Sequence, residues 1–205
     1  DGFVCGCGTY ILYKNEVLFS QTVPFEIGNE LVSDLEKYNI EWLLEGEKTL
    51  YYRNKPYTTH IGDFKDEQKH LYPSAYKELE PSKASDLVFD KFCIGIHKNS
   101  DFKSFEAKYS KIFTIIDRGN NFYEIVPANC SKATGMEFLM KHFNVDKKDT
   151  IAIGDSTNDL TMLEFAGTSI AMKHSSPIVL EKADYVTDDV FDDGIYNAMK
   201  HFELI

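Results

Sequence analysis

The sequence predicts an α/β protein whose C-terminal part is a doubly wound layer built on a parallel sheet. After Pro127, short apolar segments alternate with helical patterns over short connections, which is typical of such layers. Residues 150–153 form a short, continuous apolar run, as expected for a strand buried on both faces of a parallel sheet. The earlier part mixes helical and antiparallel patterns. At 205 residues, the chain can form one larger domain or two small ones.

The first half is predicted to be α+β. We expect residues 3–12 to form a strand, in which the glycines permit a bulge or a close backbone approach. Residues 29–38 carry apolar side chains at helical spacing, with Asn29 as the candidate N-cap. Residues 41–52 predict two extended segments that are interrupted at Gly46.

The segment before Pro127 predicts a hairpin. Strands are expected at residues 91–97 and 112–117, with a helix at residues 100–109 between them. Residues 118–121 (RGNN) have the composition of a turn into a further strand at residues 122–126. This turn could reach a substrate, and so could a polar, aromatic stretch containing Arg53, Lys55, Tyr57 and His60. We interpret both as solvated loops.

The elements after Pro127 are predicted from caps and apolar runs. Ser131 is a suitable N-cap for a helix over residues 131–143, and Gly167 ends a helix over residues 159–165. Ser176 and Pro177 supply the cap and the first residue of another helix. The remaining elements are strands at residues 150–153, 169–172 and 184–187 and a final helix at residues 194–202.

Charge and composition exclude several partners. A net charge of −11 argues against nucleic acid and against an anionic membrane surface, because both require a cationic patch. No apolar run approaches the roughly 20 residues of a membrane helix. The chain begins at Asp1 without an initiator Met, which suggests a processed, cleaved or incompletely represented product.

The four cysteines predict a reducing environment. Cys5, Cys7, Cys93 and Cys130 are few and scattered, so a disulfide framework is not expected and the cytoplasm is the predicted location. Cys5 and Cys7 lack the two-residue spacer and the second Cys/His pair of a metal or redox site. We therefore predict buried, inert thiols.

Residues 154–159 (GDSTND) are the segment most indicative of function. Gly154 and Asp155 follow the apolar run at residues 150–153, at the strand end where open α/β sheets bind ligands. Asp155 can ligate a hard cation such as Mg²⁺, while Asn158 and Asp159 in the first helical turn can contact a phosphoryl oxygen or orient the metal ligand. A turn with an ordinary helix cap is an equally good interpretation of these six residues alone.

Lys132 favours the functional interpretation. It begins the helix over residues 131–143, where a cation is disfavoured by the helix dipole. A bound phosphate, or Asp155 itself, would compensate the lysine charge. The alternative is a solvated surface lysine.

Two motifs resemble the haloacid dehalogenase (HAD) superfamily, namely residues 126–132 (VPANCSK) and residues 153–163 (IGDSTNDLTML). Residues 166–167, 170–172, 183–187 and 193–195 continue the similarity, which is strongest to the Cof-type sugar-phosphatase branch with a large α/β cap (type IIB). Residues 7–11 (CGTYI) depart from that branch, which usually has an Asn-Gly-Ala-type turn there. The resemblance implies a HAD core at residues 1–12 and 127–205, and an inserted α+β cap at residues 13–126.

The resemblance also implies Mg²⁺-dependent hydrolysis of phosphate monoesters through an aspartyl-phosphate. Lys132 would neutralise the phosphoryl oxygens and the nucleophile, and Asp155 would bind Mg²⁺. Asn158 would contact the phosphate, and Asp159 would support the metal shell. Phosphoryl transfer depends mainly on positioning and charge neutralisation, which agrees with these residue types.

The opening motif of that family, Asp-x-Asp-Gly-Thr after an apolar strand, is absent from the 205 residues, as is the Ser or Thr of the second motif. We therefore expect a core that is incomplete at its N-terminus, with the nucleophile upstream of Asp1. Residues 1–205 alone are predicted to hydrolyse nothing.

Three functions are compatible with these observations. The leading one is a cytoplasmic phosphatase acting on small phosphorylated metabolites, such as sugar phosphates. A phosphomutase of the same superfamily and a non-catalytic phosphate-binding module are the alternatives. The sequence does not specify the substrate or the oligomeric state.

Overall fold

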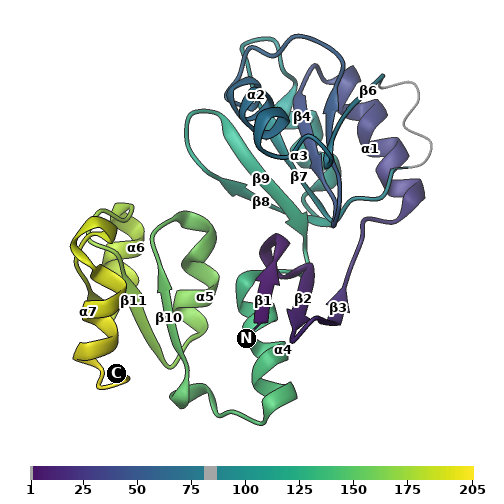
Figure 1. Ribbon diagram of the computed structural model, residues 1–205. Coiled ribbons are helices and arrows are strands. Elements are labelled where there is room, and N and C mark those ends of the chain that lie inside the picture. The colour runs from purple at the N-terminus through teal and green to yellow at the C-terminus, as the bar shows by residue number, and fades with distance from the viewer. Residues whose placement is uncertain (1, 81–86) are drawn as a thin grey trace. The chain divides into compact units, whose positions relative to one another are not determined.

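The computed structural model describes residues 2–80 and 87–205 (Figure 1). The contacts within the chain divide it into two compact units, Asp1–Asn129 and Cys130–Ile205. Asp1 itself, the first residue of the predicted core, lies outside the described residues. The assignment of residues 1–12 and 127–205 to a core and of residues 13–126 to a cap stays a prediction.

The first unit begins with a three-stranded antiparallel sheet of β1 (Gly2–Cys5), β2 (Tyr10–Tyr13) and β3 (Glu16–Ser20). The prediction of one strand over residues 3–12 was wrong, because a 3-10 turn at Gly6–Gly8 reverses the chain. Gly6, Cys7 and Gly8 all have positive φ, at 56°, 53° and 92°. Glycine tolerates this conformation, and the sequence supplies two glycines in three positions. The buried thiol of Cys7 donates a hydrogen bond to Glu124 at 3.1 Å.

A six-stranded sheet forms the larger part of the first unit. Its order is β6 (Tyr76–Leu79), β5 (Leu50–Arg53), β4 (Glu41–Glu45), β7 (Lys91–Gly95), β9 (Phe122–Pro127) and β8 (Phe113–Asp117). Neighbouring strands are antiparallel except β5 and β6, which are parallel. The two extended segments around Gly46 and the β8–β9 hairpin confirm the sequence predictions. β3 and β6 were not predicted.

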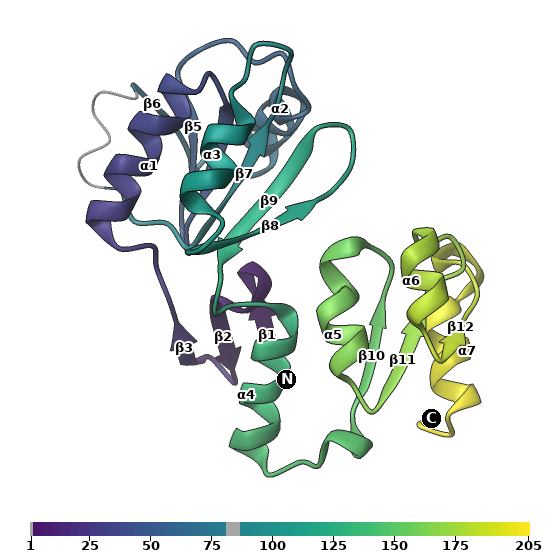
Figure 2. The same ribbon diagram turned by 180° about the vertical axis from the view of Figure 1, so that it is seen from behind.

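Helices cover both faces of this sheet. α1 (Phe25–Lys37) and α3 (Phe102–Tyr109) pack on one face around Trp42, Phe92 and Phe105 (Figure 2). α2 (Ile61–Leu71), which was not predicted, packs on the other face against Leu43, Tyr52 and Cys93.

The predicted start of α1 was wrong. The helix begins at Phe25, four residues before Asn29, so Asn29 lies within the helix and does not cap it. Pro24 occupies the N-cap position. Its lack of an N–H costs nothing there, because the first amides of a helix have no intrahelical partner.

The second unit is the predicted α/β layer. β10 (Ile151–Gly154), β11 (Thr168–Ala171) and β12 (Tyr185–Val186) form a parallel sheet. Four helices accompany it, namely α4 (Lys132–Phe143), α5 (Leu160–Phe165), α6 (Pro177–Lys182) and α7 (Gly194–His201). The core contains Ala152, Leu163, Ala171 and Val179. The predicted order of strands and helices in this unit is confirmed.

The cysteines are free thiols, and Cys7, Cys93 and Cys130 are buried as predicted. Cys5 is exposed, which contradicts the prediction for that residue, because it lies at the end of β1 with its side chain off the core. Across the described part of the chain, no helix is both long enough and apolar enough to cross a membrane.

Candidate active site

Lys132 is placed by the N-terminal cap of α4. The Oγ of Ser131 accepts a hydrogen bond from the Thr134 amide at 3.1 Å, and the Ser131 amide donates to Thr134 Oγ1 at 2.9 Å. This capping box satisfies two backbone donors and makes Lys132 the first residue of the helix. The predicted cap at Ser131 is confirmed.

Asp159 compensates the charge of Lys132. The Nζ of Lys132 lies 2.5 Å from Asp159 Oδ1, and 29% of the lysine side chain but only 6% of the aspartate side chain is exposed. Asp159 thus compensates the positive charge of Lys132, a role that the sequence suggested for a bound phosphate or for Asp155.

The second carboxylate oxygen of Asp159 also accepts hydrogen bonds. Its Oδ2 accepts hydrogen bonds from the amides of Asp155, at 3.0 Å, and Ser156, at 3.1 Å. Burial opposes ionisation of Asp159, but the ion pair with Lys132 and these amides hold its pKa below the usual value. Gly154 allows this arrangement, because a Cβ at that position would lie 2.6 Å from Asp159 Cβ.

Asp155 directly follows β10 and is exposed. Its backbone is fixed on both sides: the amide donates to Asp159, and the carbonyl accepts from the Ser176 amide at 3.2 Å. Among residues 2–80 and 87–205, no group donates a hydrogen bond to its carboxylate. Asp155 therefore combines a fixed backbone with a carboxylate that is open to a cation.

Asn158 is held by a residue that the sequence analysis did not assign. The Oγ of Ser156 donates to Asn158 Oδ1 at 2.8 Å and lies 3.4 Å from Asp159 Oδ2. Ser156 also forms a capping box with Asp159. The Ser-x-x-Asp spacing at the start of a helix was the signal that could have identified Ser156.

The structure therefore gathers all four predicted site residues at the carboxyl end of β10. Comparison with known families adds to this geometry: a model of haloacid dehalogenase-like hydrolases matches residues 1–199. The chain belongs to the haloacid dehalogenase-like hydrolases.

Individual relatives support this membership. The protein named "Putative phosphatase YkrA" of Bacillus subtilis is 26% identical over 208 residues, covering 99% of this chain and 76% of the relative. The solved structure of a HAD subclass IIB sugar phosphatase has a TM-score of 0.81 at 23% identity, over 100% of this chain and 76% of the other. A HAD phosphatase of Bacteroides thetaiotaomicron also gives 0.81, at 22% identity, over 100% and 75%.

The predicted resemblance and the α/β fold class are thereby confirmed. The neighbours include subclass IIB, the branch that the motifs indicated. At these identities the solved structures establish the fold. This HAD-like hydrolase spans about three-quarters of the length of each of the three proteins.

The residues of this HAD-like hydrolase are suited to Mg²⁺ in their chemistry. Mg²⁺ takes oxygen ligands and often binds through one or two carboxylates while keeping several waters. Asp155 offers one such carboxylate. Both carboxylate oxygens of Asp159 are already hydrogen-bonded. Asp159 is therefore suited to holding Lys132 and the Asp155 backbone in place beside a bound metal. Within the described residues, no group of three or more His, Cys, Asp or Glu side chains could hold a metal.

Proposed function

We propose that the protein is an Mg²⁺-dependent phosphatase that acts on small phosphorylated metabolites. The observation that carries the proposal is the ion pair between Lys132 and Asp159 beside the open carboxylate of Asp155. An ammonium group held next to an available carboxylate suits a ligand that contains both a cation and a phosphate.

Each residue has a distinct part in this proposal. Lys132, fixed by Asp159, neutralises phosphoryl oxygens as negative charge develops on them. Asn158, oriented by Ser156, contacts the phosphate. Asp155 binds the metal. Asp159 supports the metal site by holding Lys132 and the Asp155 amide in place. When bound, Mg²⁺ supplies positive charge that stabilises the phosphoryl group.

The nucleophile in this proposal is an aspartate upstream of Asp1, which forms an aspartyl-phosphate that water then hydrolyses. No strand within the sequence is followed by an Asp-x-Asp pair of the required kind. Residues 1–205 alone are accordingly expected to be inactive.

The proposed substrates are sugar phosphates or related metabolites in the cytoplasm. Support comes from the names of similar proteins, which include a sugar phosphatase and a 5-amino-6-(5-phospho-D-ribitylamino)uracil phosphatase. We propose no nucleic-acid or membrane partner, because the net charge is −11.

A panel of phosphorylated metabolites tested on the full-length protein, with and without Mg²⁺, examines the proposal. Release of inorganic phosphate supports the phosphatase. Isomeric phosphorylated products without free phosphate would identify the phosphomutase alternative. Binding of phosphorylated compounds without turnover would identify the non-catalytic module.

A further inference from the structure

One edge of the six-stranded sheet is apolar. β8 (Phe113–Asp117) is the last strand of that sheet, and no strand within the described residues pairs with its outer side. Natural proteins usually protect an edge strand with charged side chains, a proline or a bulge, because its backbone groups can pair with another chain. Residues 113–116 (FTII) contain no charge and no proline, and the register of β8 with β9 is unbroken. The β8 edge is therefore open to pairing.

The opposite edge of the sheet differs in its chemistry. β6 carries Lys77 and Glu78, and both side chains are exposed. The carboxylate of Glu78 lies 3.5 Å from Lys65 Nζ and 3.6 Å from Lys69 Nζ. Removing these charges from water would oppose strand pairing at β6, whereas residues 113–116 have no charge to desolvate.

The hydrogen bonds between β8 and β9 determine which backbone groups face outward. The Ala128 amide donates to the Ile112 carbonyl at 3.0 Å, so the backbone groups of Ile112 face β9. In an antiparallel pair, successive residues direct their backbone groups to opposite sides, and the unbroken register continues this alternation along β8. The N–H and C=O groups of Phe113 and Ile115 therefore point outward along the edge.

The side chains of Ile112, Thr114 and Ile116 share one face of the strand. Phe113 and Ile115 lie on the opposite face, where they pack in the core under α1 and α3. Ile112 is 42% exposed, Thr114 is exposed and Ile116 is half-buried. The two isoleucines present apolar surface that strand pairing would remove from water.

We propose that β8 pairs antiparallel with β8 of a second copy of this chain, with the two-fold axis at Thr114. In this register, Phe113 of one copy lies opposite Ile115 of the other, and their outward N–H and C=O groups exchange hydrogen bonds. On the other face, Ile112 of one copy lies opposite Ile116 of the other, and the two Thr114 side chains meet at the axis. One strand thus supplies both halves of a two-fold contact.

The charges that flank β8 match in the same register. Lys111 precedes the strand, Asp117 ends it, and both are exposed. Antiparallel pairing about Thr114 places Lys111 of each copy opposite Asp117 of the other, and opposite charges in such positions stabilise paired strands. A shift of the register by two residues would place Lys111 opposite Gly119, which carries no charge. Charge complementarity therefore selects a second copy in this register as the partner.

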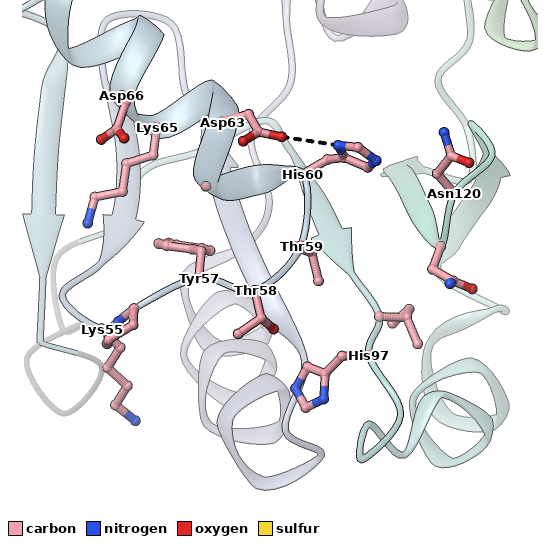
Figure 3. Close-up of a pocket in the computed structure, with 14 residues that line it drawn as sticks. Lys55, Tyr57, Thr58, Thr59, His60, Asp63, Lys65, Asp66, His97 and Asn120 are labelled. Atoms are coloured by element: carbon pink, nitrogen blue, oxygen red, sulfur yellow. Dashed lines mark hydrogen bonds and ion pairs between the residues drawn. The ribbon is translucent and has the colours of Figure 1, made fainter.

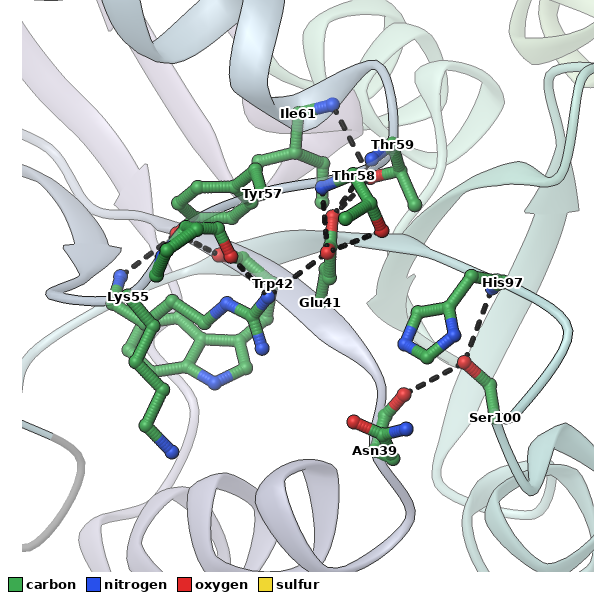
Figure 4. A network of polar contacts seen from close by, with 12 residues as sticks. Asn39, Glu41, Trp42, Lys55, Tyr57, Thr58, Thr59, Ile61, His97 and Ser100 are labelled. Atoms are coloured by element: carbon green, nitrogen blue, oxygen red, sulfur yellow. Dashed lines mark hydrogen bonds and ion pairs between the residues drawn. The ribbon is translucent and has the colours of Figure 1, made fainter.

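The sheet behind β8 is ordered before any partner binds. Phe113 is 4% exposed, and its ring packs edge-on against Phe92 at a centroid distance of 5.2 Å. Further into the sheet, Glu41 of β4 accepts hydrogen bonds from the amides of Thr58 and Thr59 at 2.8 and 3.0 Å (Figure 4). A strand that its own core holds in place loses little conformational entropy when it pairs.

The β8 edge is separate from the cavity of the first unit. That cavity, of about 670 Å³, lies between α2, the end of β7 and the β8–β9 turn (Figure 3). Asn120 and Asn121 of the turn line it, but Phe113–Asp117 do not. Substitutions on β8 therefore leave the cavity lining unchanged, and the dimer proposal does not depend on the phosphatase activity.

Sedimentation equilibrium of the full-length protein over a concentration series tests this proposal. A single pair of short strands buries less area than a standard interface, so the dimer should be reversible and become populated toward about 0.5 mM. Under dimerising conditions, the amides of Phe113 and Ile115 should also exchange hydrogen more slowly than in dilute protein, because they gain acceptors across the axis.

Two substitutions probe the register. Thr114→Lys places two like charges opposite each other at the axis and should weaken dimerisation by about tenfold or more. Lys111→Glu should weaken it by about tenfold, since the change acts twice across the two-fold axis. Adding Asp117→Lys to Lys111→Glu should restore dimerisation, because the charges are then exchanged.

Thr22→Lys is the matched control, because Thr22 is an exposed threonine in the connection between β3 and α1. It should dimerise like the unsubstituted protein. A protein that stays monomeric up to about 0.5 mM overturns the proposal. So does a dimer that Thr114→Lys weakens no more than Thr22→Lys, or one in which Asp117→Lys does not restore the Lys111→Glu variant.

Discussion

The negative charge of the Asp159 carboxylate is stabilised by an ion pair and by backbone hydrogen bonds. It is almost fully buried, yet Lys132 pairs with one of its oxygens and two backbone amides donate to the other. A buried charge with one partner removed is costly, because the remaining charge keeps its desolvation penalty. The stability of this corner therefore depends on Lys132 as strongly as the proposed chemistry does.

Replacing Lys132 by Met should destabilise the second unit by about 2 kcal/mol or more, because Asp159 loses its counter-ion. Hydrogen exchange of the Asp155 and Ser156 amides is the direct measurement, since both donate to Asp159. Lys141→Met is the control, because Lys141 and Glu137 form an exposed pair on α4. Equal exchange in the two variants would contradict the account.

Asp159 also predicts a pH dependence. Its pKa in the folded protein is lowered by Lys132 and the amides, against the opposing effect of burial. Its stabilising contribution is therefore complete above the ordinary carboxyl pKa and is lost as the pH falls through the lowered value. On acidification, the Asp155 amide should stay protected to a lower pH in the unsubstituted chain than in Lys132→Met. Identical acid profiles would be the contrary result.

At the scale of elements, Glu41 connects β4 to the loop before α2. It lies at the start of its strand and accepts four hydrogen bonds from Thr58 and Thr59 besides the Arg53 pair. This network explains why a polar segment that looks like a solvated loop is ordered.

The substitution Glu41→Gln should lower the free energy of unfolding by about 3 kcal/mol, since an amide group replaces an acceptor oxygen and the buried Arg53 loses its counter-ion. Urea denaturation followed by the fluorescence of Trp42, the single tryptophan, measures this. Glu47→Gln, which alters an exposed carboxylate paired with Lys48, should change little. A Glu41→Gln variant as stable as Glu47→Gln would refute the structural role.

The turn at Gly6–Gly8 predicts a contrast between two glycines with positive φ. A Cβ at Gly6 would lie 2.1 Å from Thr9 Oγ1, whereas nothing lies within 4 Å of a Cβ at Gly119. Gly119→Ala should cost about 1 kcal/mol from backbone strain alone, and Gly6→Ala about 2 kcal/mol or more. The same Trp42 denaturation assay compares them. Equal losses in the free energy of unfolding would mean that the Thr9 side chain moves away from the added methyl group without cost.

The elements that the sequence predicted well are those with local signals. Ser131 and the Ser176-Pro177 pair mark helix starts by their own chemistry, and the apolar run at residues 150–153 marks a buried strand. The start of α1 at Phe25 was missed because its cap position holds Pro24, and no polar capping side chain marks it. The 3-10 turn was missed because Val4 and Ile11 favour strand on both sides of it.

The sequence predicted which residues lie together at the candidate site but not which of them pair. Lys132, Asp155, Asn158 and Asp159 were all predicted from their motifs, and their functional roles stay proposals. The pairing of Lys132 with Asp159 depends on α4 and the turn after β10 meeting in space, which no local pattern encodes.

At the scale of the whole molecule, the chain contributes the Lys132–Asp155 part of the proposed active site. We propose that this part serves phosphate hydrolysis and that Asp155 holds Mg²⁺. Because the Asp155 carboxylate is exposed and accepts no hydrogen bond from any described residue, replacing it by Asn should leave folding unchanged. Activity and stability can therefore be separated at this residue.

The most direct test is the Mg²⁺-dependent release of phosphate from an aryl phosphate by the full-length protein and by its Asp155→Asn variant. We expect turnover that requires Mg²⁺, with a loss of about a hundredfold or more in the variant. We also expect no turnover by residues 1–205 alone. Undiminished activity of a folded Asp155→Asn variant would contradict the proposed role of Asp155 as the Mg²⁺ ligand.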